Sequence, residues 1–121
     1  MPEYDAIIIG TDSPLGRVGM TEAEVRKSGK PALMATMAME DVSRAFEKGE
    51  TLGFMKILVD GDTKQILGAS ILGTNGDEVI HAILDLMYAK APYTVMQRAM
   101  HIHPTVSELL PTMLGDLRPL E

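Results

Sequence analysis

The spacing of hydrophobic and polar residues divides the chain into short helices and strands. Residues Thr21–Gly29 predict a helix, because Thr21 and Glu24 form a capping box at its start and a glycine ends it. A second helix is predicted for Asp77–Ala91, where apolar residues recur at the helical period and Pro92 follows. Its buried face is expected to consist of Ile80, Ile83, Leu84 and Met87.

Three further segments predict shorter helices. The last begins at Thr105, has Glu108 three residues later and stops at Gly115. Asp41–Gly49 predicts one or two helical turns, and Tyr93–Met100 predicts a short turn or helix. The apolar face of the C-terminal helix is predicted to be Leu109, Leu110, Met113 and Leu114.

Runs of β-favouring residues predict strands around a central hairpin. Leu52–Val59 and Gln65–Leu72 are separated by the polar segment Asp60–Lys64, which indicates a turn between antiparallel strands. Gly68 and Gly73 indicate a bulge or the close approach of another backbone segment. Further extended segments are predicted for Leu15–Met20 and Ala32–Met39.

The N-terminal segment Tyr4–Gly10 has a different character from the rest. Its continuous apolar run predicts a strand of the kind buried on both faces in a parallel sheet, and Gly10 could open a dinucleotide-binding turn. That turn would need glycines at positions 12 and 15, which hold Asp12 and Leu15, and the Asp12 carboxylate would repel a pyrophosphate. Residues 1–10 are therefore expected to differ in origin from the residues that follow.

The segregation of strands and helices predicts the fold class α+β. We expect a small antiparallel β-sheet covered by helices on one side.

Composition and charge exclude several classes of function. The 11 basic against 17 acidic residues give a net charge of −6, which argues against binding nucleic acid or an anionic membrane surface. Apolar runs such as Ala6–Ile9 are far shorter than the roughly 20 residues of a membrane span, so a cytoplasmic location is expected. The absence of Cys excludes thiolate chemistry within this chain, and 10 Met favour an adaptable apolar surface and self-association.

Three histidines are the candidates for proton transfer near neutral pH. His81 is predicted to be an exposed ion-pair partner of Asp77 and Asp85, four residues away on either side. His101 and His103 could both ligate a metal ion from one side of an extended segment, but no third ligand has a recognisable spacing, so no metal site is predicted.

His103 and Glu108 admit two interpretations. Thr105 and Glu108 have the spacing of a capping box, which needs no function. A carboxylate one turn into a helix can also reach back to an imidazole just before it, fix the tautomer and raise the pKa of the histidine, as a general acid/base requires. Spacing alone leaves both interpretations open.

Three segments resemble a known domain. These are PLGRVGMTEAEVRKSG at residues 14–29, GFMKILVD at residues 53–60 and HIHPTVSELLPTMLGDLRPL at residues 101–120. Together they resemble the C-terminal dimerisation domain of flavin-dependent pyridine nucleotide-disulfide oxidoreductases, a family that includes glutathione reductase, dihydrolipoamide dehydrogenase and mercuric reductase. YDAIIIG at residues 4–10 resembles the first strand of the FAD domain of the same family. The resemblance implies a remnant of the FAD-binding strand at residues 1–10 and a dimerisation domain at residues 11–121.

The resemblance also implies a role for the two site residues. In a parent enzyme His103 would project into the active site of the partner subunit and exchange a proton with a nascent thiol, while Glu108 orients it. The parent would carry FAD and NAD(P)H, whereas this chain is expected to bind no cofactor and to be inactive alone. A homodimer and a cis His103–Pro104 bond are also implied.

Two further points qualify this interpretation. Mercuric reductases carry Cys near the C-terminus, where this chain has none, so the sequence does not support mercuric ion as the substrate. The alternative function is a stand-alone dimeric interaction or small-ligand-binding module that reuses the fold.

Overall fold

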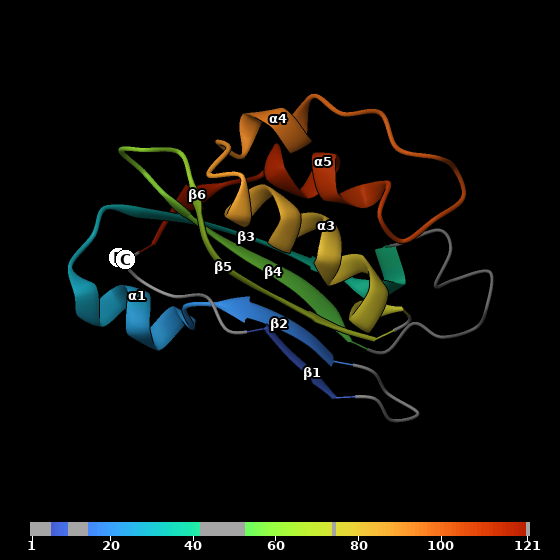
Figure 1. The fold of residues 1–121 in the computed structure, drawn as a ribbon, viewed down its shortest axis with the longest axis horizontal. Coiled ribbons are helices and arrows are strands. Elements are labelled where there is room, and N and C mark those ends of the chain that lie inside the picture. Colours follow the sequence, from blue (N-terminus) through green and yellow to red (C-terminus); the bar gives the residue numbers. More distant parts are fainter. Residues whose placement is uncertain (1–5, 10–14, 42–52, 74, 121) are drawn as a thin grey trace.

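The strands form one antiparallel sheet in the computed structural model, which describes residues 6–9, 15–41, 53–73 and 75–120 (Figure 1). Within these residues the sheet has six strands in the order β1-β2-β5-β4-β3-β6, and every neighbouring pair is antiparallel. The strands are β1 (Ala6–Ile9), β2 (Leu15–Gly19), β3 (Ala32–Ala38), β4 (Phe54–Asp60), β5 (Ile66–Leu72) and β6 (Arg118–Pro119).

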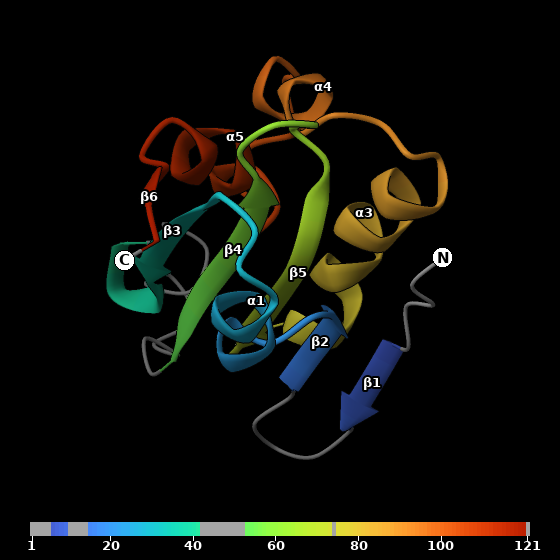
Figure 2. The same ribbon diagram turned by 90° about the vertical axis from the view of Figure 1, so that its left-hand side faces the viewer.

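Helices lie on both faces of the sheet. The described helices are α1 (Glu22–Ser28), α3 (Gly76–Tyr88), α4 (Thr94–Gln97) and α5 (Leu109–Leu114), with a 3₁₀ turn, η1, at Met39–Asp41. In Figures 1 and 2, α3, α4 and α5 lie on one side, and α1 lies on the other. The α+β class is confirmed, but the expectation that helices cover only one side was wrong. The connection from β2 to β3 has to cross β5 and β4, and α1 makes that crossing over the opposite face.

The main core lies between the sheet and the helices α3 and α5. A smaller core lies beneath α1, where Val25 packs on Leu58 and Leu67. The predicted apolar face of α3 is confirmed, with Ile80, Ile83 and Met87 buried and Leu84 half-buried. The predicted face of the last helix is also confirmed: Leu110, Met113 and Leu114 are buried, and Leu109 is half-buried.

The predicted bounds of α1 are confirmed, but only half of the capping box is present, because the Glu24 carboxylate accepts from the Thr21 hydroxyl rather than from the Thr21 N–H. Thr21 Oγ1 accepts a hydrogen bond from Glu24 N at 3.1 Å, and Gly29 ends the helix with a φ of 73°. The β4–β5 hairpin is also present, with a register shift between Leu58 and Val59, opposite Gly68. A Cβ at Gly68 would lie 2.0 Å from the carbonyl oxygen of Met20, so the predicted close backbone approach is confirmed as well.

The first strand is present, but the prediction that it is of the kind found in a parallel sheet was wrong. β1 pairs antiparallel with β2, with Ala6 opposite Val18 and Ile9 opposite Leu15. A parallel crossover needs about a dozen residues or more, and the connection between Ile9 and Leu15 is too short to provide it. The boundary between Gly10 and Thr11 remains a prediction.

The last helix begins later than the capping box indicated. α5 starts at Leu109 rather than Thr105. A helix from Thr105 would place Pro111 in its interior, where proline lacks the N–H needed to bond to the carbonyl of Ser107. Starting at Leu109 places Pro111 in the first turn, where proline is tolerated.

The remaining predictions concern the bounds of α3 and α4, the segment after Asp41 and the C-terminal strand. The helix predicted for Asp77–Ala91 ends at Tyr88, and Tyr93–Met100 contains α4 as expected. The turns predicted for Asp41–Gly49 lie, beyond Asp41, outside the described residues. β6 was not predicted, because two residues carry no pattern. No helix in the described part of the chain is long and apolar enough to cross a membrane.

Candidate functional site

His103 and Glu108 are in contact. Nδ1 of His103 lies 2.8 Å from Oε1 and 3.0 Å from Oε2 of the Glu108 carboxylate. Both residues belong to the segment 100–108, called here the histidine loop, which joins α4 to α5 at the orange to red end of the chain in Figure 1. The His103–Pro104 peptide bond in this loop is cis, as predicted.

The same carboxylate also completes a capping box. Oε2 of Glu108 accepts a hydrogen bond from Thr105 N at 3.0 Å, and Glu108 N donates to Thr105 Oγ1 at 3.2 Å. The Thr105 hydroxyl donates in turn to the carbonyl of Ile102 at 2.6 Å. The two interpretations of Glu108 are therefore compatible, since one carboxylate contacts both the backbone and the imidazole.

The electrostatics of the pair favour an ionised Glu108. The hydrogen bond with His103 is the main cause that lowers the pKa of Glu108, burial acts in the opposite direction, and the Thr105 N–H lowers it further. The Glu108 side chain is only 17% exposed, whereas that of His103 is 70% exposed. The arrangement can hold a carboxylate fixed against an imidazole that solvent or a partner molecule reaches.

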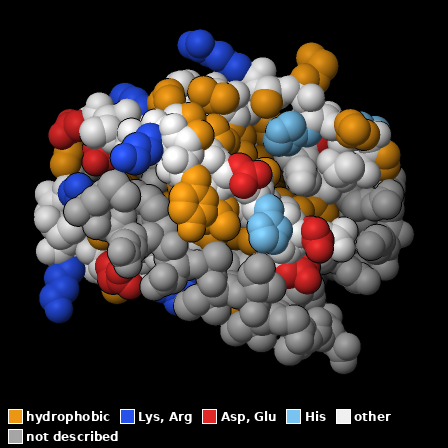
Figure 3. Space-filling model, in the orientation of Figure 1, with side chains coloured by type: hydrophobic (Ala, Val, Ile, Leu, Met, Phe, Trp, Pro, Cys, Tyr) orange, Lys and Arg blue, Asp and Glu red, His pale blue; other side chains and the backbone are white. Residues whose placement is uncertain are grey.

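Exposed apolar side chains occur in the histidine loop and on α4, which precedes it in the chain. Met100 is 98% exposed, Ile102 is 79% exposed and Val95 is 54% exposed. Figure 3 shows hydrophobic side chains exposed among histidine and acidic ones on the face turned toward the viewer in Figure 1. Exposed apolar side chains next to a polar site are typical of surfaces that contact a partner.

The other two histidines have different surroundings. His101 Nδ1 lies 2.8 Å from the carbonyl oxygen of Ser107, within the histidine loop. His81 is exposed on α3 as predicted, but among the described residues it forms no ion pair with Asp77 or Asp85. No group of three or more potential metal ligands occurs in the part of the chain that the structure describes.

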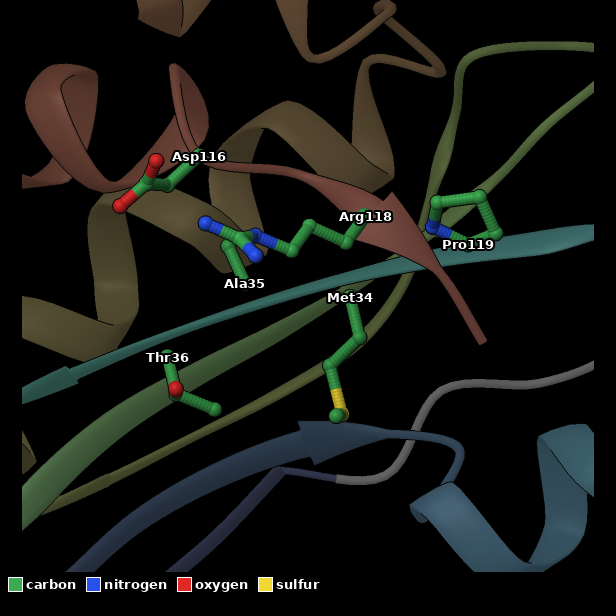
Figure 4. Close-up of a pocket in the computed structure, with 6 residues that line it drawn as sticks. All are labelled: Met34, Ala35, Thr36, Asp116, Arg118 and Pro119. Atoms are coloured by element: carbon green, nitrogen blue, oxygen red, sulfur yellow. The ribbon is translucent and has the colours of Figure 1, made fainter. Parts of the chain in front are cut away.

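Sequence reasoning missed a cavity of about 410 Å³ at the β3–β6 edge of the sheet. It forms because β6 pairs with only Leu33 and Met34 of β3. In Figure 4 the Arg118 guanidinium extends along β3 past Ala35 in the direction of Asp116. None of its lining residues belongs to the predicted site; they are Met34, Ala35, Thr36, Asp116, Arg118 and Pro119.

Comparisons with known proteins identify a family. The family model described as "Pyridine nucleotide-disulphide oxidoreductase, dimerisation domain" matches residues 6–114. The probable pyridine nucleotide-disulfide oxidoreductase RclA of Escherichia coli is 37% identical over 97 residues, which covers 80% of this chain and 22% of that protein. Dihydrolipoyl dehydrogenase of Manduca sexta is 40% identical over 110 residues, which covers 88% of this chain and 22% of that protein.

A solved structure has a similar fold. It is the HOCl-induced flavoprotein disulfide reductase RclA from Escherichia coli, with a TM-score of 0.91 at 31% identity. The similarity covers 95% of this chain and 26% of that one. This chain thus spans about a quarter of the length of the relatives that it matches.

Proposed function

Because the chain belongs to the pyridine nucleotide-disulphide oxidoreductase family as a dimerisation domain, we propose that His103 and Glu108 form a proton relay. In a full-length enzyme this relay serves the redox disulfide of the partner subunit, and the present chain alone is inactive. The observation that carries the proposal is the 2.8 Å contact between His103 Nδ1 and Glu108 Oε1.

The proposed relay gives each atom of the pair a task. Glu108 is an acceptor when ionised, so the Nδ1–H of His103 donates to it and the titrating proton binds at Nε2. A thiol S–H gives its proton to Nε2, which leaves a thiolate and an imidazolium, and the reverse transfer restores the thiol. The ionised carboxylate stabilises the imidazolium between these two transfers.

The described residues do not fit FAD or NAD(P)H. A dinucleotide-binding fold places the cofactor at the carboxyl ends of parallel strands, whereas every strand pair among the described residues is antiparallel. Both cofactors would be supplied by other parts of a full-length enzyme, consistent with the similarity to a flavoprotein disulfide reductase.

A homodimer is part of the same proposal. The relay acts on a disulfide only where a second subunit brings that site to the histidine loop. The exposed Met100 and Ile102 flank His103 and are suited to burial against such a subunit.

NMR titration of His103 tests whether the relay pair forms. We expect the pKa of His103 to be lower in Glu108→Gln than in the wild type, because the ionised carboxylate favours the imidazolium. Glu24→Gln is the matched control: Glu24 donates its N–H to Thr21 Oγ1 at the start of α1, but α1 has no histidine. Coincident His103 curves in wild type and Glu108→Gln would reduce Glu108 to a capping residue and overturn the relay.

A further inference from the structure

The first half of the histidine loop has little burial to hold it in place. Met100, Ile102 and His103 are exposed, whereas the second half is anchored by Val106, which is 2% exposed. Pro104 is half-buried. Hydrogen bonds therefore contribute more than side-chain packing to holding this half of the loop.

His101 forms a hydrogen bond with the carbonyl of Ser107, two residues before α5 begins. In a continuous helix this carbonyl would accept from the N–H four residues later, but residue 111 is proline and has none. It accepts from Leu110 N at 3.1 Å instead, and from the His101 ring at 2.8 Å. The imidazole thus supplies a donor that the proline cannot.

We propose that His101 is a positioning residue: its ring clamps the start of the histidine loop to the carbonyl of Ser107 and so holds His103 against Glu108. His101 lies two residues before His103, and Ser107 directly precedes Glu108. The contact between His101 and Ser107 therefore holds together the two parts of the loop that carry the relay pair. This inference rests on the proposed relay and adds a residue to it.

The chemistry of the contact determines the tautomer of His101. A carbonyl oxygen can only accept, so Nδ1 must carry the proton, and neutral His101 has its unprotonated nitrogen at Nε2. Protonation of the ring leaves the Nδ1–H donor in place. The clamp therefore persists whether His101 is neutral or charged.

Nitrogen-15 NMR of the wild-type imidazoles tests the clamp without any substitution. We expect neutral His101 to show a protonated Nδ1 and an unprotonated Nε2. The opposite tautomer, or rapid exchange between the two, would overturn the clamp.

A double-mutant cycle tests whether the clamp positions the relay. The measured quantity is the change in the pKa of His103 that Glu108→Gln causes, determined with His101 intact and in His101→Ala. We expect His101→Ala to reduce this change by about half or more, because contacts within one network are not additive. His101→Asn should restore it, since its side-chain amide places an N–H close to the position of Nδ1. His81→Ala is the control, because this histidine is exposed on α3 and lies outside the histidine loop.

The outcomes separate the two proposals. An unchanged effect of Glu108→Gln in His101→Ala, with the core amide signals at their wild-type positions, would overturn the positioning role. If Glu108→Gln leaves the pKa of His103 unchanged even with His101 intact, the relay is wrong. The clamp is then tested by the tautomer of His101 alone.

Discussion

Replacing Gly68 by alanine should destabilise the sheet strongly. Gly68 lies on β5 between β4 and β2, where it pairs with Leu58 and Gly19. A Cβ at this position would lie 2.0 Å from the oxygen, 2.8 Å from the nitrogen and 2.9 Å from the carbon of Met20. These are backbone atoms, and Met20 N is already bonded to Leu67 O at 2.9 Å. No flexible side chain can move aside to admit the methyl group.

The expected loss follows from the two effects involved. Overpacking costs about 1–3 kcal/mol, and a weakened backbone hydrogen bond adds about 1 kcal/mol, so the free energy of unfolding should fall by about 2–4 kcal/mol. An unfolding entropy of about 2.1 cal/mol/K per residue gives about 250 cal/mol/K for 121 residues. Each kcal/mol then corresponds to about 4 °C, and the Tm should fall by about 8–16 °C.

Thermal unfolding followed by circular dichroism, at one fixed protein concentration, measures this loss. Two other glycines separate the clash from other effects. Gly29 has a φ of 73° but nothing within 4 Å of a Cβ, so Gly29→Ala should cost only the strain of about 1–2 kcal/mol. Gly115 has a φ of −73° and a Cβ there would lie 3.2 Å from the oxygen of Thr112, so Gly115→Ala should cost much less than Gly68→Ala. A Gly68→Ala variant that melts within about 2 °C of the wild type would refute the reasoning.

Three further predictions concern the histidine loop. The pKa of Glu108 is lowered in the folded chain, chiefly by its hydrogen bond with His103. The ionised carboxylate therefore stabilises the fold above the unfolded-state pKa, and this contribution is lost as the pH falls through the folded-state pKa. The Tm difference between wild type and Glu108→Gln should vanish in acid, and a difference that stays constant with pH would contradict this. In a chimera that carries residues 15–120 in place of the matching segment of the Escherichia coli relative, His103→Ala should lower disulfide-reductase turnover by about 10²–10⁴-fold. His81→Ala is the control in that chimera, and equal turnover of both variants would exclude the relay. Light scattering should give the mass of two chains. Ile102→Glu should shift this mass toward one chain, whereas Tyr88→Glu, which also changes an exposed apolar residue, should not. A monomeric wild type at tens of micromolar would count against the dimer.

The elements that sequence predicted well have local signals at both ends. α1 (Glu22–Ser28) is bounded by the caps Thr21 and Gly29, and the β4–β5 hairpin is determined by two β-rich runs around a polar turn. The late start of α5 could also have been predicted, since Pro111 excludes a helix that begins at Thr105.

The remaining features depend on residues distant in sequence. The apolar run of β1 contains no information about the direction of its partner, which the short connection to β2 decides. At the candidate site, the spacing of His103 and Glu108 predicted a possible contact. The role of His101 could not be predicted, because it depends on where the carbonyl of Ser107 lies.

The two edges of the sheet differ in how they discourage strand addition from other molecules. β6 ends one side with an arginine and a proline, and proline has no N–H to offer an incoming strand. β1 ends the other side with four uncharged residues, Ala-Ile-Ile-Ile, and pairs only with β2 among the described strands. An apolar edge without proline or lysine is a template for intermolecular β-pairing. Among the described strands β1 is therefore the edge that is more open to strand addition, and a lysine placed there should reduce such pairing.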